Sequence, residues 1–280
     1  MTAPAKSNSE QIEFWNGDAG QRWVTQQEQL DAMLADIGAE ILKTAAAKPG
    51  EHVLDVGCGC GETSLKLADA VGANGNVTGV DISQPMLARA KSRAGGKHVT
   101  FVQADAASHH FTQEFDLLFS RFGVMFFADP DAAFANMRKA LKPTGRVAFV
   151  CWREPRENEW VRVPIAAARE HVPPPPQLGP EDPGPFSFAN PGRVRRILAN
   201  GGFDVITMRP LDTPLTLGET LDEAVEYIQQ FGPIARLLNE ATPQQREAAA
   251  KAIREAMKPY AKSAPVRLIG ATWLVTAKCG

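Results

Sequence analysis

The residues of this chain with the clearest chemical potential form a short loop of alternating glycines. Asp55 is followed by Val-Gly-Cys-Gly-Cys-Gly, which places Gly57, Gly59 and Gly61 at every second position. The loop follows a short apolar segment and precedes a helical pattern. Glycines between a strand and a helix bring backbone N–H groups against a nucleotide-like ligand. The loop therefore predicts a site for such a ligand.

The residue after the third glycine favours a ligand without phosphate. A dinucleotide-binding loop needs its third glycine one position later, where this chain has Glu62. A carboxylate at a helix start opposes the binding of a pyrophosphate, which is itself negative. S-adenosylmethionine has no phosphate, and Asp55 can attract the ammonium group of its methionine part. The loop hence favours S-adenosylmethionine over a nicotinamide dinucleotide.

Two further acidic residues end the next two predicted strands. Asp81 can accept hydrogen bonds from both hydroxyls of a ribose, and Asp105 can accept one from the exocyclic amine of adenine. Each residue alone is equally well explained as the N-cap of a helix, a common place for Asp. Together with Asp55 they mark three carboxyl ends of strands, where open α/β sheets bind ligands. The series indicates a ligand site more strongly than any single member.

The elements that must position these residues alternate between strand and helix patterns. Strand patterns cover 53–56, 77–81, 99–102, 115–119, 146–152, 203–208 and 266–277. Short apolar runs alternating with helices are typical of a mostly parallel sheet covered on both faces, so a doubly wound α/β fold is predicted. Phe134, Met137 and Leu141 share one helical face, which predicts a helix that ends at 142–145.

The remaining helical patterns divide the chain around this core. In chain order we expect an amino-terminal helical arm (1–48), the cofactor-binding core (49–154), a loop and helix insertion (155–190), the continued core (191–217), a helical cap insertion (218–262) and the last core strand (263–280).

The arm carries an apolar stripe and an aromatic cluster. Apolar residues recur at helical spacing over 30–41 and predict one amphipathic helix. Before it, Phe14, Trp15 and Trp23 surround a turn-rich stretch, 16–20, which is unusually aromatic for a surface. The arm is interpreted either as a packed helical segment or as a segment that closes over a ligand, and the two are compatible.

The composition of the chain argues against several classes of binding partner. The chain has 280 residues and a formal net charge of −2, so it lacks the basic surplus expected of a protein that binds nucleic acid or an anionic membrane. We find no secretory signal and no transmembrane stretch, and therefore expect a cytoplasmic protein. Cys58 and Cys60 have no further Cys or His at ligand spacing, so no metal site is expected.

Together these segments resemble a known family. The motifs HVLDVGCGCG (52–61), VDIS (80–83), QADA (103–106), FDLLFS (115–120) and LKPTGRV (141–147) are similar to the successive motifs of class I S-adenosylmethionine-dependent methyltransferases. More narrowly, they resemble the bacterial group related to the ubiquinone/menaquinone methyltransferases. The resemblance implies a Rossmann-like, seven-stranded sheet whose last strand is antiparallel and inserted between its neighbours.

The resemblance also implies a set of cofactor-binding residues. The loop glycines would admit the methionine part of the cofactor, and Asp81 would hold its ribose. Ile82 and Ala106 would flank the adenine ring, Asp105 would bind its amine, and Ser120 would lie beside the sulfonium. The predicted set is Asp55, Gly57, Cys58, Gly59, Gly61, Asp81, Ile82, Met86, Asp105, Ala106 and Ser120.

The segment after the fourth predicted strand bears on the methyl acceptor. Enzymes that methylate amino groups of nucleic-acid bases tend to carry Asn/Asp-Pro-Pro-Tyr there, whereas this chain has Ser-Arg-Phe-Gly at 120–123. We therefore expect a small organic acceptor, bound between the core and the two insertions. No oligomeric state follows from the sequence.

Methyl transfer is an in-line displacement in which alignment of the reacting groups can supply about 7–11 kcal/mol. If a general base is needed, His109 and His110 are the candidates, the alternative being a solvated loop pair. Arg121 either holds a carboxylate or phenolate of the acceptor, or forms an ion pair with Asp129 or Asp131.

Two rival functions use the same sheet. The chain could bind the cofactor as a regulator or scaffold without catalysis, or it could be a nicotinamide oxidoreductase. Turnover separates the first rival from a methyltransferase, and the preferred ligand separates the second.

Overall fold

The computed structural model describes residues 8–112, 114–174, 179, 181–230 and 232–280. It contains two compact units, one with 1–151, 182–210 and 273–280, and one with 152–181 and 211–272. Part of the predicted 155–190 insertion, at 175–178 and 180, lies outside the described residues. The functional division of the chain into six segments stays a prediction.

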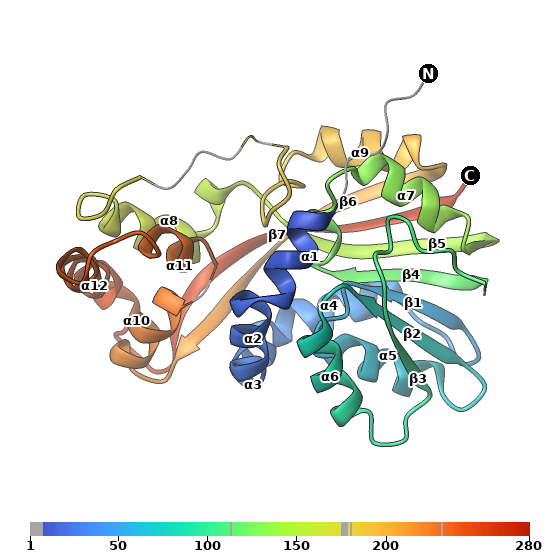
Figure 1. Ribbon diagram of the computed structural model, residues 1–280, viewed down its shortest axis with the longest axis horizontal. Helices are drawn as coiled ribbons and strands as arrows, with labels where there is room; N and C mark the ends of the chain where they lie inside the picture. The colour runs from blue at the N-terminus through green and yellow to red at the C-terminus, as the bar shows by residue number, and fades with distance from the viewer. Residues whose placement is uncertain (1–7, 113, 175–178, 180, 231) are drawn as a thin grey trace. The chain divides into compact units, whose positions relative to one another are not determined.

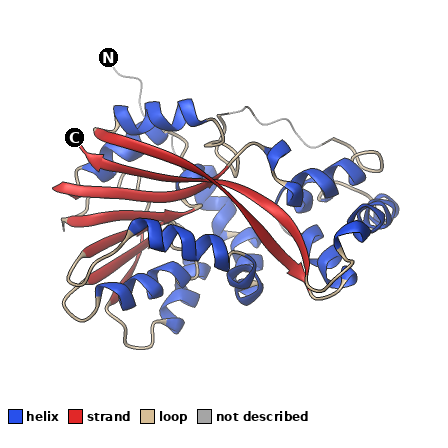
Figure 2. Cartoon of the chain, turned by 180° about the vertical axis from the view of Figure 1, so that it is seen from behind, coloured by secondary structure: helices blue, strands red, loops and turns tan. Residues whose placement is uncertain are grey.

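A seven-stranded sheet carries the predicted motifs, and Figure 2 shows its strands in red. The strands are β1 (His52–Val56), β2 (Asn76–Asp81), β3 (Val99–Gln103), β4 (Phe115–Arg121), β5 (Leu141–Trp152), β6 (Phe203–Gly218) and β7 (Val266–Cys279). Their order is β3-β2-β1-β4-β5-β7-β6, and each neighbouring pair from β3 to β5 is parallel. The predicted α/β fold with a mostly parallel seven-stranded sheet is confirmed, and the last strand lies between its neighbours as expected.

The helices of the first unit lie against this sheet. They are α1 (Ser9–Asn16), α2 (Asp18–Thr25), α3 (Gln27–Met33), α4 (Ala35–Ala45), α5 (Glu62–Val71), α6 (Gln84–Arg93), η1 (Val124–Phe126), α7 (Pro130–Arg138) and α9 (Pro191–Asn200). α4 contacts α5 and β4, α5 also contacts β1, and α7 contacts α9. Figure 1 shows α7 beside α9 above β4 and β5, with α4, α5 and α6 below them. The central strands are buried almost throughout, with Leu54, Val77 and Phe119 fully covered, as a sheet with two covered faces requires.

The prediction of a single amphipathic helix over 30–41 is wrong in one respect. Its apolar stripe is buried as expected, but the chain leaves helical geometry at Leu34, which separates α3 from α4. Periodicity could not reveal this break, because α3 and α4 keep their apolar residues on the same side.

The predicted end of the helix before the fifth strand is also wrong. α7 ends at Arg138, and Leu141 begins β5, where it lies opposite Phe115 of β4. The N–H of Phe115 donates to the carbonyl of Ala140 at 2.8 Å. Pairing with β4 therefore draws Leu141 into the sheet, although its spacing from Met137 also fits a helix.

The second unit is mainly helical. It contains η2 (Pro155–Glu157), α8 (Glu159–Ala168), α10 (Leu221–Gln230), α11 (Gly232–Leu238), α12 (Pro243–Met257), η3 (Lys258–Tyr260) and the adjoining parts of β6 and β7. α8 packs against α12, and the ring of Trp160 is buried, with its N–H donating to Asn158 at 3.0 Å. Within the described part of the chain, no helix has both the length and the apolar character to span a membrane.

Candidate functional site

The candidate site lies where β3, β2, β1 and β4 end, since these four strands are neighbours in that order. The loops that follow them begin at Gly57, Ile82, Ala104 and Phe122. β1 has β2 on one side and β4 on the other, so the chain changes direction across the sheet at β1. Such a switch point is where open α/β sheets bind ligands. The fold therefore brings the predicted acidic residues and glycines to one edge.

The three loop glycines differ in what surrounds them. All have positive φ, but a Cβ on Gly57 would lie 2.6 Å from the Cα of Gly123, and one on Gly61 would lie 2.9 Å from the Phe101 ring. These two positions are therefore glycine because the protein packs closely there. At Gly59 the nearest such neighbour is the indole nitrogen of Trp23, 4.0 Å away. Gly59 is thus the glycine whose Cα faces room for a ligand.

Asp81 ties the end of β2 to this loop. Its carboxylate accepts the N–H of Gly59 at 2.8 Å and the N–H of Ser83 at 2.9 Å. Burial raises the pKa of Asp81, although these backbone donors oppose the shift. An ionised carboxylate has about four lone-pair positions. Asp81 can therefore hold the loop and still accept hydroxyl groups.

Asp105 lies at the neighbouring strand end and is half-buried. It accepts the N–H of Ala107 at 2.9 Å, and both of its oxygens accept from the side-chain amide of Asn8, at 2.9 and 3.0 Å. Between Asp81 and Asp105, the carbonyl of Ile82 accepts from the side-chain amide of Asn16 at 3.0 Å. Ala106 and Met86, also in the predicted set, are buried. The residues predicted to surround the adenine therefore lie together, and Asn8 and Asn16 of the arm form hydrogen bonds with them.

Asp55 is enclosed rather than presented at the surface. It is fully buried, and one carboxylate oxygen accepts the hydroxyls of Thr63 and Ser64 at 2.9 and 2.6 Å. The other oxygen makes no hydrogen bond within the described residues. Burial raises the pKa of Asp55 to about 6, against the effects of the two hydroxyls and of Arg121. Its predicted attraction for an ammonium stays a prediction.

The loop cysteines behave as small apolar residues. Cys58 is buried in a cluster with Leu87, Ala90 and Phe101, and Cys60 is also buried. Burial raises the pKa of both thiols, so neither is activated as a thiolate. Over the residues that the structure describes, no group of His, Cys, Asp and Glu could hold a metal ion.

Ser120 links the end of β4 to the glycine loop. Its buried hydroxyl donates to the carbonyl of Val56 at 2.7 Å and accepts the N–H of Gly123 at 3.1 Å. Between them, Phe122 has φ of 65°, a strained conformation for a bulky residue. Strain of this kind concentrates at functional sites. No pattern in the sequence predicts this conformation, because only the backbone geometry reveals it.

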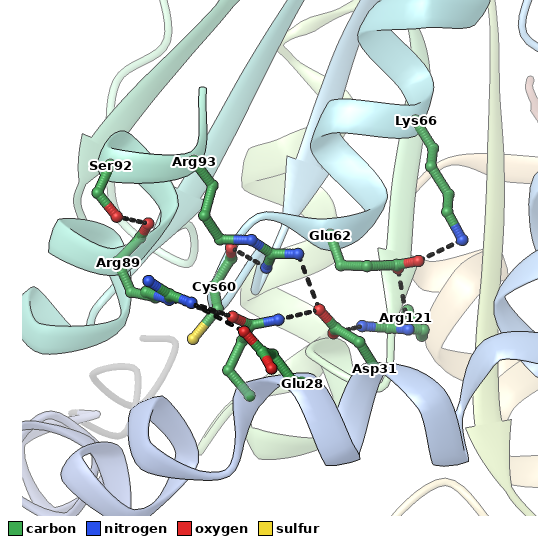
Figure 3. A network of polar contacts seen from close by, with 10 residues as sticks. Glu28, Asp31, Cys60, Glu62, Lys66, Arg89, Ser92, Arg93 and Arg121 are labelled. Carbon is green, nitrogen blue, oxygen red and sulfur yellow. Dashed lines mark hydrogen bonds and ion pairs between the residues drawn. The ribbon is translucent and has the colours of Figure 1, made fainter. Parts of the chain in front are cut away.

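The partners predicted for Arg121 are wrong. Its guanidinium forms ion pairs with Glu62 at 3.0 Å and with Asp31 at 3.5 Å, and Figure 3 shows it between these two carboxylates. Asp129 instead caps α7 and Asp131 accepts from Asn200. The guanidinium is mostly buried by these contacts, so it joins the arm to the start of α5. We withdraw the expectation that Arg121 holds the acceptor.

The two candidate bases have different surroundings. His109 is half-buried, its ring lies 4.8 Å from that of Phe111 in an edge-to-face contact, and its carbonyl accepts from Asn136 at 2.9 Å. His110 is exposed. Both follow Asp105 at the same edge, so their role as a base stays a prediction.

Comparison with known proteins identifies the core. Residues 53–145 match the family model described as a methyltransferase domain. The 2-phytyl-1,4-naphtoquinone methyltransferase of Trichormus variabilis is 32% identical over 124 residues, which are 42% of this chain and 54% of that protein. The ubiquinone/menaquinone biosynthesis C-methyltransferase UbiE of Shewanella piezotolerans is 34% identical over 122 residues, 42% of this chain and 49% of that protein. The chain spans about half the length of the curated relatives it matches.

Solved structures share the fold. Phosphoethanolamine N-methyltransferase 2 of Haemonchus contortus, solved with S-adenosyl-L-methionine, aligns with 100% of this chain and 62% of its own, with a TM-score of 0.59 and 20% identity. The YcgJ protein of Bacillus subtilis aligns over 88% of this chain and 98% of its own, with a TM-score of 0.57 and 19% identity.

Proposed function

Because residues 53–145 form a methyltransferase domain of the class I type, we propose that this chain transfers a methyl group from S-adenosylmethionine to a small organic acceptor. The observation that carries the proposal is the contact between Asp81 and the N–H of Gly59, with Asp105 at the next strand end. This contact fixes a carboxylate beside the least tightly packed glycine of the loop. An adenosine with a short cationic tail needs such a combination of acceptors and room.

The residues at the edge fit this cofactor in three places. Gly59 leaves room above the loop, Asp81 keeps lone pairs for ribose hydroxyls, and Asp105 offers an acceptor for the adenine amine. The buried oxygen of Asp55 that lacks a hydrogen bond lies at the end of β1, where the cationic tail would come closest. Glu62, which is ion-paired with Arg121, stands where a dinucleotide-binding loop needs its third glycine.

The cofactor would supply an electrophilic methyl group on a sulfonium, so the chain's own residues have to orient it and the acceptor. Asp81 and Asp105 would fix the adenosine, and Gly59 would allow the tail to approach the backbone. His109 is the better placed of the two histidines to take a proton, because its half-buried position restricts its motion. The ion pairs of Arg121 with Glu62 and Asp31 support a structural role for it rather than acceptor binding.

The relatives suggest where to look for the acceptor. Two of them are named for naphthoquinone and ubiquinone or menaquinone methylation, but the similarity covers only 42% of this chain. We therefore put reduced quinones first among the acceptors to test and keep phenols, carboxylic acids and amines beside them. The predicted cytoplasmic location agrees with acceptors of this size.

The test is to incubate the protein with S-adenosylmethionine and each acceptor, and to measure S-adenosylhomocysteine by mass spectrometry. We expect product with one acceptor class, above a control without acceptor, and less product from the Asp81→Ala variant at a limiting concentration of S-adenosylmethionine. A protein that binds the cofactor but yields no product with any class would instead favour the regulator or scaffold.

A further inference from the structure

The amino-terminal arm crosses the same sheet edge as the candidate site. Its contacts at the outer strand are made by Asn8, whose side-chain amide donates to both oxygens of Asp105, at 2.9 and 3.0 Å. The side-chain oxygen of Asn8 accepts the N–H of Ala128 at 2.7 Å. Asn8 is 7% exposed. One side chain therefore joins the end of β3 to the segment before α7.

The next contacts are made at the end of β2. The side-chain amide of Asn16 donates to the carbonyl of Ile82 at 3.0 Å, and its oxygen accepts the N–H of Gln84 at 2.9 Å. The hydroxyl of Ser83 donates to the carbonyl of Trp15 at 2.7 Å. Each of these arm residues uses a polar group next to the loop that would surround the ribose.

The last contacts are aromatic and reach β1 and β4. The indole nitrogen of Trp23 lies 4.0 Å from the position of a Cβ on Gly59. The ring of Trp15 lies 5.7 Å from that of Trp23 and 5.3 Å from that of Phe126, both edge to face. The arm thus touches all four loops of the site.

The two ends of the arm are held differently. At α3, Asp31 forms ion pairs with Arg93 and Arg121, and the side-chain oxygen of Gln27 accepts from Arg89 at 2.9 and 3.0 Å. Figure 3 shows the ion pairs that hold α3, the end of the arm at which Asp31 lies. By contrast, α1 has no buried residue, and Phe14 is 53% exposed. An element with so little buried surface opens at low cost.

We propose that residues 8–23 form the outer wall of the cofactor site, and that Asn8 latches this wall by binding Asp105. The inference rests on the proposed function, because it assigns the wall to the bound cofactor. Asn8 leaves lone pairs on Asp105 for the adenine amine, and its bond keeps α1 over the adenosine. The cofactor enters and leaves when α1 lifts from this contact, while α3 stays in place.

The test measures how fast the cofactor leaves. Methyl-tritiated S-adenosylmethionine is bound to the full chain and chased with excess unlabelled ligand. We expect the dissociation rate to rise about tenfold in Asn8→Ala, because that variant loses a hydrogen bond to a charged group. Asn8→Asp should raise the rate at least as much, since two carboxylates would then face each other.

Asn200→Ala is the matched control. Asn200 donates its side-chain amide to the carboxylate of Asp131 at 2.7 Å, so the control loses the same kind of bond between α9 and α7. We expect both alanine variants to have similar melting temperatures, and only Asn8→Ala to release the cofactor faster. A residue with a merely structural role would change the melting temperature and leave the release rate unchanged.

The outcomes separate the two claims. If the wild type binds and Asn8→Ala releases the cofactor at the wild-type rate, or binds it more tightly, the latch is wrong and the proposed function stands. If the wild-type chain does not bind S-adenosylmethionine at all, the proposed function is wrong, and the assignment of the wall to the cofactor is wrong with it.

Discussion

Asp81 carries the most direct prediction at the scale of single residues. Its carboxylate holds Gly59 and Ser83 and keeps lone pairs for a ribose. We expect Asp81→Ala to weaken S-adenosylhomocysteine binding at least about tenfold in calorimetry, because hydrogen bonds to charged groups contribute about 1.5–3 kcal/mol. Asp131→Ala, which removes a carboxylate that accepts from Asn200, should leave the affinity unchanged.

An analogue without ribose hydroxyls distinguishes the ribose contact from the loop contact. We expect the wild type to bind this analogue more weakly than S-adenosylhomocysteine, and Asp81→Ala to bind both alike. If the variant still prefers the hydroxylated ligand by the wild-type ratio, Asp81 does not hold the ribose.

Asp55 has a consequence for the pH dependence of stability. Its pKa rises from 3.8 to about 6 on folding, so the folded state binds the proton more tightly. The stabilisation is complete below the unfolded pKa and is lost as the pH rises through about 6. Asp55→Asn keeps an acceptor for Thr63 and Ser64. We expect the difference in the free energy of unfolding, variant minus wild type, to rise by about 3 kcal/mol between pH 4 and pH 7. Urea titrations at both pH values measure it.

Asp116 provides a control of opposite sign. Burial alone would raise its pKa, but hydrogen bonds from Lys142 and the N–H of His52 outweigh burial and hold the pKa below its usual value. Asp116→Asn should therefore lose stability relative to the wild type as the pH rises above about 3. A difference for Asp55→Asn that does not change with pH would contradict its raised pKa.

Arg121 is where interpretation of the sequence failed at this scale. The sequence suggests Asp129 and Asp131, in the segment that follows Arg121, as its partners, but the fold brings Asp31 and Glu62 to it. We expect Arg121→Met to destabilise the fold by about 1–3 kcal/mol, because the buried carboxylate of Glu62 loses its guanidinium and keeps only Lys66 as a partner. The double variant with Glu62→Gln should recover part of this loss in urea unfolding. An Arg121→Met protein of normal stability but with a raised KM for its acceptor would restore the withdrawn role.

At the scale of elements, Gly20 tests how the arm packs. A Cβ at this position in α2 would lie 2.0 Å from the carbonyl oxygen of Trp15 and 3.0 Å from the hydroxyl of Ser83. Gly20→Ala should therefore push α1 and α2 off the sheet edge, at a cost of about 1–3 kcal/mol. We expect about fivefold to hundredfold faster hydrogen exchange across 9–25 by mass spectrometry, since about 1.4 kcal/mol is tenfold.

Gly17 in the same arm is the matched control. A Cβ there would lie 3.4 Å from the carbonyl oxygen of Glu13, which is an ordinary contact, and its φ of −87° suits alanine. Gly17→Ala should exchange at the wild-type rate. Equal rates in the two variants would mean that the close approach at Gly20 does not hold the arm.

The strands and the glycine loop could be predicted because their signals are local. Apolar runs between turn residues mark β1 to β5, and alternating glycines mark the loop. The break at Leu34 and the start of β5 at Leu141 could not be predicted, because tertiary contacts decide them. The sequence does not decide whether the arm packs or closes over a ligand for the same reason: the partners of Asn8 and Asn16 lie far along the chain.

At the scale of the whole molecule, the comparison with known proteins covers the core and not the segments around it. The family model matches 53–145, which holds every predicted cofactor-binding residue but neither the arm nor the second unit. The arm and the second unit, with Trp160 and Tyr227 buried inside the latter, lie outside the segment that the family model matches. The acceptor has therefore to be found by assay, whereas the cofactor can be argued from the strand ends.

The central claim is that this sheet edge binds S-adenosylmethionine, and calorimetry of the wild-type chain tests it most directly. S-adenosylhomocysteine and NADH are titrated separately into the same protein at pH 7.5. We expect one molecule of S-adenosylhomocysteine to bind per chain, and no binding of NADH, because Glu62 stands where a dinucleotide-binding loop needs its third glycine. Tight binding of NADH with none of S-adenosylhomocysteine would contradict the account and favour an oxidoreductase.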